Sequence, residues 1–294
     1  MTADPTQTEP SETQVPVLQP GIPFGDYCDL DAVNATKLLT YRGRSCRAAR
    51  YQQIHGIKET PSLLKGHALH AAVLEPDVFG KLYATQPTAK ELGFNDFRPR
   101  AAQVARDKWL EEHVQSVNMT RDEWNATVFM RDSILSDPTT AQFFTGKGSS
   151  ELTLTWTDKT TQLDCKGRVD RLTFYHNYPA LVDIKTARDV DDRECEKAIF
   201  NYGYHIRLAW YLDALMAYRP GDFRVFIVWV QNSPPYEARY TELEDDPLRE
   251  GRAQYRHLLD LHAECLKKNE WPGYPEGLPV GIPQWGYKLT VPRG

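Results

Sequence analysis

The N-terminal half of the chain begins with a polar segment and then shows apolar residues at helical spacing. Residues 1–22 are rich in Pro, Thr, Ser, Gln and Glu and contain few large apolar side chains. Such a segment cannot bury enough surface to offset the entropy lost on ordering, so we expect a disordered tail. Asn34 or Thr36 is a suitable N-cap for the helix that follows. Helices are predicted over 34–54, over 62–74 and over most of 100–143.

The hydrophobic pattern changes period after the break at Gly146–Ser150. Residues 151–157 (ELTLTWT) alternate between polar and apolar, 165–175 (CKGRVDRLTFY) alternate less regularly, and 180–186 (ALVDIKT) form a short apolar run ending in charge. Both patterns are typical of strands. Turn-forming residues between these segments predict an antiparallel meander.

The C-terminal half returns to helix and then to strand. A helical stretch should reach about Tyr218, and 223–231 (FRVFIVWVQ) has the pattern of a buried strand. Residues 236–243 are its expected hairpin partner, and 246–268 a closing helix. Together these elements predict one domain, residues 23–294, of the α/β (α+β) class, with a mixed central β-sheet flanked by helices.

Composition excludes several protein classes. None of the 294 residues belongs to an apolar run of about 18, which a membrane-spanning helix needs. The N-terminus has neither the basic start nor the apolar stretch of a secretory signal, so we expect a cytoplasmic protein. The five widely spaced cysteines predict reduced thiols rather than disulfides or zinc ligands. A net charge of −5 argues against nonspecific nucleic-acid binding through overall charge, but allows a DNA enzyme with a local basic surface.

Two acidic residues and one lysine form the most informative chemical pattern. Asp170 lies in one predicted strand, and Asp183-Ile184-Lys185 ends the next. Strand alternation should place Asp183 and Lys185 on one face and Ile184 in the core. Two carboxylates suit Mg²⁺, which polarises a scissile phosphate and activates water, while Lys185 could orient or deprotonate that water. The plainer alternative is a solvated ion pair.

Five segments follow one another in a distinctive order: GHALHAAVLEP, ELTLTW, GRVDRL, LVDIKTA and YHIRLAWYLDAL. From about residue 34 to 290 the chain thereby resembles the exonuclease VIII family, in the RecB-type branch of the PD-(D/E)XK nucleases. The resemblance implies a restriction-endonuclease-like core. It also implies cleavage of linear double-stranded DNA with Mg²⁺ or Mn²⁺, in the 5′→3′ direction, during phage-type recombination or repair. A single-strand annealing protein and a homo-oligomeric ring are the further partners it suggests.

Matching positions carry the family's roles onto this chain. His70, Asp170 and Asp183 would be metal ligands, and Lys185 the catalytic lysine. The neutral imidazole of His70 would suit Mn²⁺ as well as Mg²⁺, although a lone histidine on a partly apolar helix is more often structural. Glu151 matches an acidic position of the family and is a candidate to bind metal directly or through water. An exposed acid at a strand end is the alternative for Glu151.

One position departs from the family pattern YxxQxxxY on the helix after the lysine strand. Tyr204, Arg207 and Tyr211 occur here, so arginine replaces the glutamine. Its guanidinium could hold a phosphate, pair with a site carboxylate or mark a changed substrate. Arg207 and Tyr211 are therefore candidates for substrate binding. Arg47, among the arginines of 42–50, is a candidate contact for the DNA backbone or a 5′-phosphate, unless that helix face is merely solvated.

Two other functions stay open from the sequence. A PD-(D/E)XK endonuclease or a flap or single-strand nuclease would keep the same fold, and the arginine at position 207 leaves room for it. A non-cleaving DNA- or partner-binding protein belongs to another class. The intact set of Asp170, Asp183 and Lys185 argues against that class, because binding alone does not need these residues.

Overall fold

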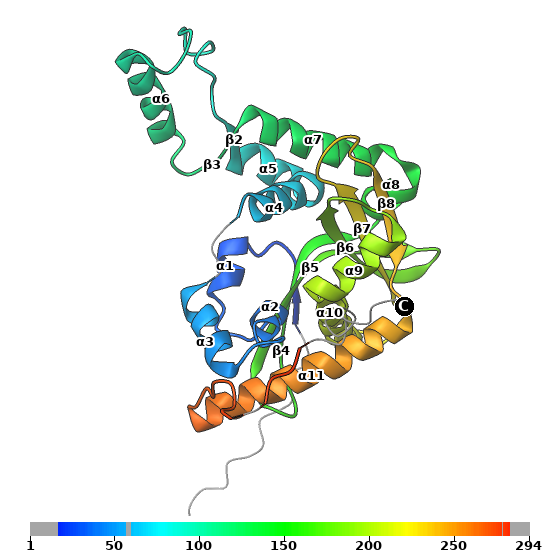
Figure 1. Ribbon diagram of the computed structural model, residues 1–294. Helices are drawn as coiled ribbons and strands as arrows, with labels where there is room; N and C mark the ends of the chain where they lie inside the picture. The colour runs from blue at the N-terminus through cyan, green and yellow to red at the C-terminus, as the bar shows by residue number, and fades with distance from the viewer. Residues whose placement is uncertain (1–16, 57–59, 278, 283–294) are drawn as a thin grey trace, which may run out of the picture.

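A six-stranded mixed sheet forms the centre of the computed structural model, which describes residues 17–56, 60–277 and 279–282 (Figure 1). Its order is β1 (Val17–Gln19), β4 (Ser149–Thr157), β5 (Asp164–Tyr175), β6 (Tyr178–Ala187), β7 (Arg224–Gln231) and β8 (Ala238–Glu242). Neighbouring strands are antiparallel except for β6 and β7, which are parallel because two helices cross over between them. The predicted meander, hairpin and mixed sheet are confirmed.

Helices cover both faces of this sheet. They are α1 (Phe24–Asp29), α2 (Ala35–Leu39), α3 (Cys46–His55), α4 (Pro61–Leu74), α5 (Pro76–Leu82), α6 (Arg100–Glu112), α7 (Arg121–Ser136), α8 (Pro138–Thr145), α9 (Asp192–Tyr202), α10 (Tyr204–Tyr218) and α11 (Asp245–Lys268). Leu181 and Ile227 pack in one core with α2, α10 and α11. Val182 and Val228 pack in another with α4, α7 and α8. None of these helices is both long and apolar enough to cross a membrane.

The helix predicted over 34–54 is two helices. Asn34 caps the first as expected, accepting a hydrogen bond from the Lys37 N–H at 2.7 Å. Gly43 then takes a left-handed φ of 66°, which an L side chain rarely adopts, and Ser45 caps the second helix. The prediction of one continuous helix is therefore wrong, because these two residues redirect the chain.

The predicted disordered tail extends too far. Residues 1–16 lie outside the described residues, but Val17–Gln19 form β1, which pairs antiparallel with β4. Leu18 packs against the larger core. Composition averaged over residues 1–22 concealed a three-residue stretch whose backbone completes one edge of the sheet.

Residues 86–116 project from the body. At their base, β2 (Tyr83–Thr85) and β3 (Val117–Met119) form a separate two-stranded parallel sheet. Helix α6 stands apart from the central sheet in Figure 1. The projecting segment therefore contributes nothing to the core beneath the central strands.

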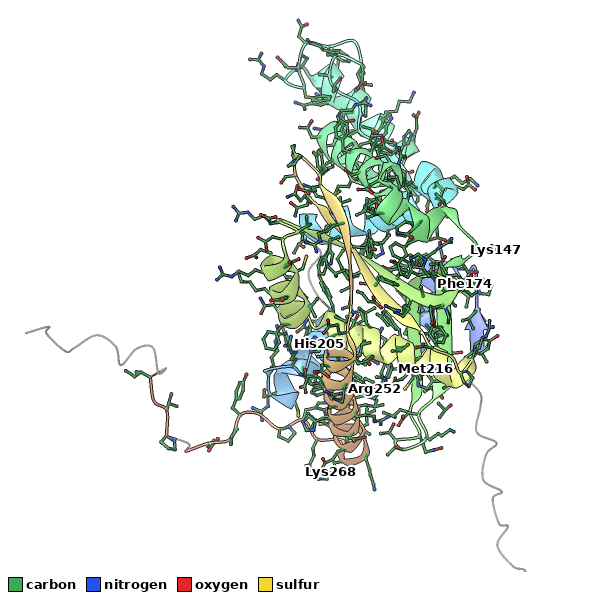
Figure 2. The ribbon with its side chains drawn as sticks, turned by 90° about the vertical axis from the view of Figure 1, so that its right-hand side faces the viewer. Lys147, Phe174, His205, Met216, Arg252 and Lys268 are labelled. Atoms are coloured by element: carbon green, nitrogen blue, oxygen red, sulfur yellow. The ribbon has the colours of Figure 1, made fainter. Side chains whose placement is uncertain are left out.

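Helices α10 and α11 approach closely at Gly251, beside His205 (Figure 2). A Cβ at this glycine would lie 2.2 Å from the His205 carbonyl oxygen. We expect Gly251→Ala to destabilise the protein by about 1–3 kcal/mol, despite the better helix propensity of alanine. Chemical denaturation measures this, with Gly80→Ala as the control, since a Cβ there meets nothing within 4 Å. Equal stability of the two variants would contradict the argument.

A buried histidine should make stability depend on pH. His262 Nδ1 lies 2.8 Å from the Tyr41 hydroxyl oxygen. Burial, followed by the charges of Lys37 and Arg50, lowers the pKa of His262 from 6.5 to about 4. The unfolded chain therefore binds a proton that the folded chain resists, and stability should fall by about 3 kcal/mol as the pH drops from 6.5 to 4. Urea denaturation across this range would test it, and a loss of the same size in His262→Gln would refute it.

Candidate metal centre

Asp170 lies where two strands of the meander separate. The β5–β6 ladder ends at the pair Arg171–Val182. Beyond this point the Ile184 N–H does not pair with β5 and instead donates to Asp170 Oδ2 at 2.8 Å. The end of the ladder thus leaves a backbone donor free to fix the orientation of a buried carboxylate.

A second irregularity brings Glu151 to the same place. Leu152 and Val169 face the core beneath α10, whereas Arg171 donates to the Phe143 carbonyl of α8 on the other side of the sheet. Residues two apart on a strand normally share a face, so β5 switches faces around Asp170. On β4 the facing residue, Glu151, has a left-handed φ of 52°. The less regular alternation of 165–175 is the sign of this switch in the sequence.

His70, Glu151 and Asp170 each offer a ligand atom, and these atoms lie within 4.8 Å of one another. His70 Nδ1 is 3.6 Å from Asp170 Oδ2, and its Nε2 is 2.9 Å from the Ile184 carbonyl oxygen. Because a carbonyl only accepts, Nε2 carries a hydrogen, and in the neutral form of the ring Nδ1 turns a lone pair toward Asp170. Two lone pairs facing each other suit a shared cation.

Lys185 joins this group from β6. Its ammonium forms an ion pair with Asp183, lies 4.0 Å from Asp170 Oδ2, and donates to the Ile184 carbonyl at 2.9 Å. The Ile184 side chain is fully buried in the core beneath α4, so the structure places this tripeptide as strand alternation predicts. Burial acts to lower the pKa of Lys185, but Asp183 and Asp170 outweigh it and raise that pKa. The amine is therefore a cation at neutral pH.

Burial and crowding perturb all three carboxyls. Burial raises the pKa of Asp183, and the neighbouring Asp170 raises it further, against the effect of Lys185. Burial and Asp170 likewise raise the pKa of Glu151. Burial also acts to raise the pKa of Asp170, but His70 and Lys185 hold it below its usual value. The charge of Asp170 thus opposes ionisation of Asp183 and Glu151, even with cations nearby.

The donor set fits a small divalent cation. Asp183 Oδ2 is buried and, despite its ion pair, accepts no hydrogen bond of good geometry from the described residues. Ligands about 2.1 Å from an octahedral ion lie about 3 Å apart when adjacent and about 4.2 Å apart when opposite, and the 3.6 Å between His70 Nδ1 and Asp170 Oδ2 falls within this range. Carboxylate oxygens and one imidazole suit Mg²⁺ or Mn²⁺. The group of ligand atoms within 4.8 Å of one another comes from His70, Glu151 and Asp170. Asp183 is not part of this group and forms an ion pair with Lys185.

Arg168 also lies at this site, although the sequence pattern did not single it out. Its Nε contacts Glu151, its Nη2 lies 3.9 Å from Glu75, and its Nη1 donates to the Ile22 carbonyl at 2.7 Å. This guanidinium holds Glu151 in place and ties the N-terminal segment to the site. A basic residue two positions before Asp170 was the available signal, because alternation predicts a shared face for the two.

Helix α10 brings Arg207 and Tyr211 toward the group. Within the described part of the chain, no carboxylate oxygen lies within 4.0 Å of the Arg207 guanidinium, and its buried Nε has no hydrogen-bond partner. The Tyr211 ring packs on Gly167, where a Cβ would lie 2.9 Å from Tyr211 Cδ1. This close approach sets α10 against β5. Arg207 therefore offers a donor that an anionic ligand could use.

Arg47 is not part of this group. Its N–H donates to the Pro272 carbonyl at 3.0 Å, and its guanidinium lies beside Gly273. Nearby, Arg42 donates to the Phe200 carbonyl at the end of α9. No hydrogen bond or ion pair connects Arg47 to the metal-ligand cluster within the described residues. Its predicted contact with DNA stays a prediction.

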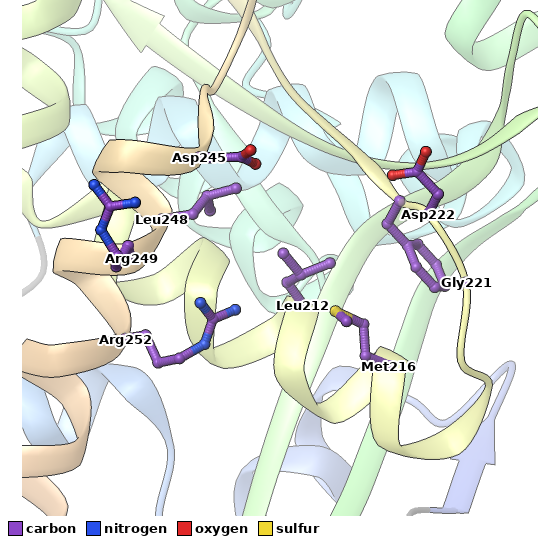
Figure 3. Close-up of a pocket in the computed structure, with 9 residues that line it drawn as sticks. Leu212, Met216, Gly221, Asp222, Asp245, Leu248, Arg249 and Arg252 are labelled. Atoms are coloured by element: carbon purple, nitrogen blue, oxygen red, sulfur yellow. The ribbon is translucent and has the colours of Figure 1, made fainter.

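A pocket of about 300 Å³ lies elsewhere, between α10, α11 and the start of β7 (Figure 3). Its lining residues are Leu212, Met216, Gly221, Asp222, Phe223, Asp245, Leu248, Arg249 and Arg252. Arg252 is already neutralised by Asp213, whose Oδ2 is 2.7 Å from its Nε. None of the predicted site residues lines this pocket, so the cluster around Asp170 is the candidate site that agrees with the sequence.

Known proteins resemble this chain mainly in fold. The crystal structure of a presumed exonuclease from Eubacterium rectale matches with a TM-score of 0.55 at 11% identity, covering 91% of this chain and 97% of that chain. The structure of SSO0001 covers 56% of this chain and 88% of its own, at 15% identity and a TM-score of only 0.28. No curated protein matches the sequence. The family described as a PDDEXK-like domain of unknown function (DUF3799) matches residues 37–279, and the chain belongs to this family.

Proposed function

We propose that the protein is a divalent-metal-dependent DNA exonuclease that hydrolyses linear double-stranded DNA in the 5′→3′ direction, in phage-type recombination or repair. The observation that carries this proposal is the convergence of His70, Glu151 and Asp170 beside the Asp183–Lys185 ion pair. Membership of a PDDEXK-like family and the fold shared with a presumed exonuclease support it. The direction and the biological role rest on the resemblance to the exonuclease VIII family.

His70, Glu151 and Asp170 would hold the cation, with Asp183 as a neighbouring oxygen donor. Once bound, Mg²⁺ or Mn²⁺ supplies Lewis-acid polarisation of the phosphate and lowers the pKa of a coordinated water. Neither ion is favoured over the other by these residues alone.

Lys185 and Arg207 would act on the phosphate and the attacking water. The Lys185 ammonium is held by Asp183 and the Ile184 carbonyl, so it is fixed before substrate arrives. A fixed cation orients water by donating a hydrogen bond and stabilises charge developing on the phosphate oxygens. Arg207 would donate a hydrogen bond to another phosphate oxygen from its Nε, which has no partner among the described residues.

Digestion of linear and closed circular duplex DNA tests the proposal. With Mg²⁺ or Mn²⁺, linear DNA labelled at the 5′ end should release its label first, closed circles should stay intact, and EDTA should stop the reaction. Cutting of closed circles would identify an endonuclease instead. If the folded protein binds DNA but digests neither linear nor circular DNA with either metal, a non-cleaving binding protein replaces the proposal.

A further inference from the structure

An exposed aromatic ring stands beside the metal-ligand cluster. Phe24 is the first residue of α1 and is 57% exposed. Its ring centroid lies 6.3 Å from that of Tyr27 beneath it and 6.0 Å from that of His67. Two other rings therefore border the Phe24 ring, while much of its side chain meets solvent. An exposed ring with such support is suited to contact with a ligand.

Two connections fix this ring relative to the cluster. The Arg168 guanidinium carbon lies 6.0 Å from the Phe24 centroid, and the same group contacts Glu151. On the other side, His67 precedes His70 by three residues on α4, so both lie on one helix face about 4.5 Å apart along the axis. Phe24 is thus joined through single residues to two of the three metal-ligand candidates.

The chemistry of this surface fits a nucleobase. Every base presents a π-face, and stacking on an aromatic side chain contributes about 1–3 kcal/mol per base. Arg207, whose charge acts on Tyr27 beside Phe24 and whose Nε has no hydrogen-bond partner among the described residues, places positive charge nearby, which suits the phosphates that flank a base. Inside a duplex both faces of a base are covered by its neighbours, a paired terminal base exposes one face, and an unpaired base exposes both faces to a protein ring.

We propose that Phe24 stacks on an unpaired base next to the phosphate that is cleaved, so that the substrate of this site is a single-stranded or opened DNA end. The inference rests on the proposed nuclease function and deepens it. A duplex end must open by at least one base pair before its strand enters the site. Ends with a terminal mismatch should therefore be digested faster than fully paired blunt ends.

Substrates that lack the stacking base test this proposal. Phe24→Ala should slow digestion of ordinary ends about 5- to 150-fold, which is the stacking free energy expressed as a rate ratio. On ends whose stacking nucleotide is abasic, wild type and Phe24→Ala should react equally, and Phe24→Trp should behave like wild type on both. Phe174→Ala is the matched control, because Phe174 is 52% exposed at the hairpin end of β5 (Figure 2). Equal slowing of ordinary and abasic ends by Phe24→Ala would overturn the proposal.

A binding measurement separates this inference from the proposed activity. In a Lys185→Met protein with Mg²⁺, a 2-aminopurine at the strand end should be quenched when anisotropy shows the DNA to be bound. Adding Phe24→Ala should remove that quenching. Unquenched 2-aminopurine in the bound Lys185→Met complex overturns the stacking role even if wild type digests DNA. Conversely, quenching that depends on Phe24 without digestion by wild type upholds it while the exonuclease proposal fails.

Discussion

Replacing Asp170 by asparagine is expected to lower the rate of DNA cleavage by at least about 10³-fold while leaving the fold intact. The variant keeps the size of the side chain and one oxygen that can accept from the Ile184 N–H. It removes the negative charge that lies 3.6 Å from His70 Nδ1 and 4.0 Å from Lys185 Nζ. A cation held in part by this charge contributes several kcal/mol of transition-state stabilisation, which sets the size of the effect.

Single-turnover digestion of linear duplex measures this loss, and calorimetric titration with Mn²⁺ should show weakened metal binding in parallel. Asp213→Asn is the matched control, since Asp213 is also ion-paired, with Arg252 on α11, but lies outside the cluster. It should lose stability without losing cleavage per folded molecule. An Asp170→Asn protein that cleaves within tenfold of wild type would remove Asp170 from the proposed site.

Lys185→Met should reduce the cleavage rate by about 10²–10³-fold, the usual effect of removing one preorganised donor to a developing charge. Methionine approximates the length of the lysine stem and removes only the ammonium that Asp183 and the Ile184 carbonyl hold. The ammonium also neutralises the buried Asp183, so the loss of that charge should raise the pKa of Asp183 further.

The affinity for Mn²⁺ distinguishes the role of Lys185 from that of Asp170. Lys185→Met should bind the ion at least as tightly as wild type, because a positive neighbour has been removed. Lys197→Met serves as the control, since Lys197 is half exposed on α9 and pairs only with Glu194 among the described residues. If Lys185→Met binds Mn²⁺ more weakly than wild type but cleaves DNA at the normal rate, Lys185 supports metal binding and does not have the proposed catalytic role.

Local periodicity was sufficient to predict most of the sheet and part of the site. The alternation in 180–186 correctly placed Asp183 and Lys185 together and Ile184 in the core. It worked because β6 is a regular strand that pairs along its length with β7. The prediction of one helix over 34–54 failed because the left-handed Gly43 acts locally, against a periodic pattern that continues on either side.

The sequence by itself determined the order of the elements, the mixed sheet and the residues able to bind a metal, because these depend on side-chain period and residue chemistry. Only the tertiary structure decided which of them meet. Glu151 and Asp170 come together where their strands depart from regular geometry, and Arg168 and Phe24 join them through contacts between segments far apart in the chain. Such contacts depend on packing across the whole fold, which no local pattern of residues encodes.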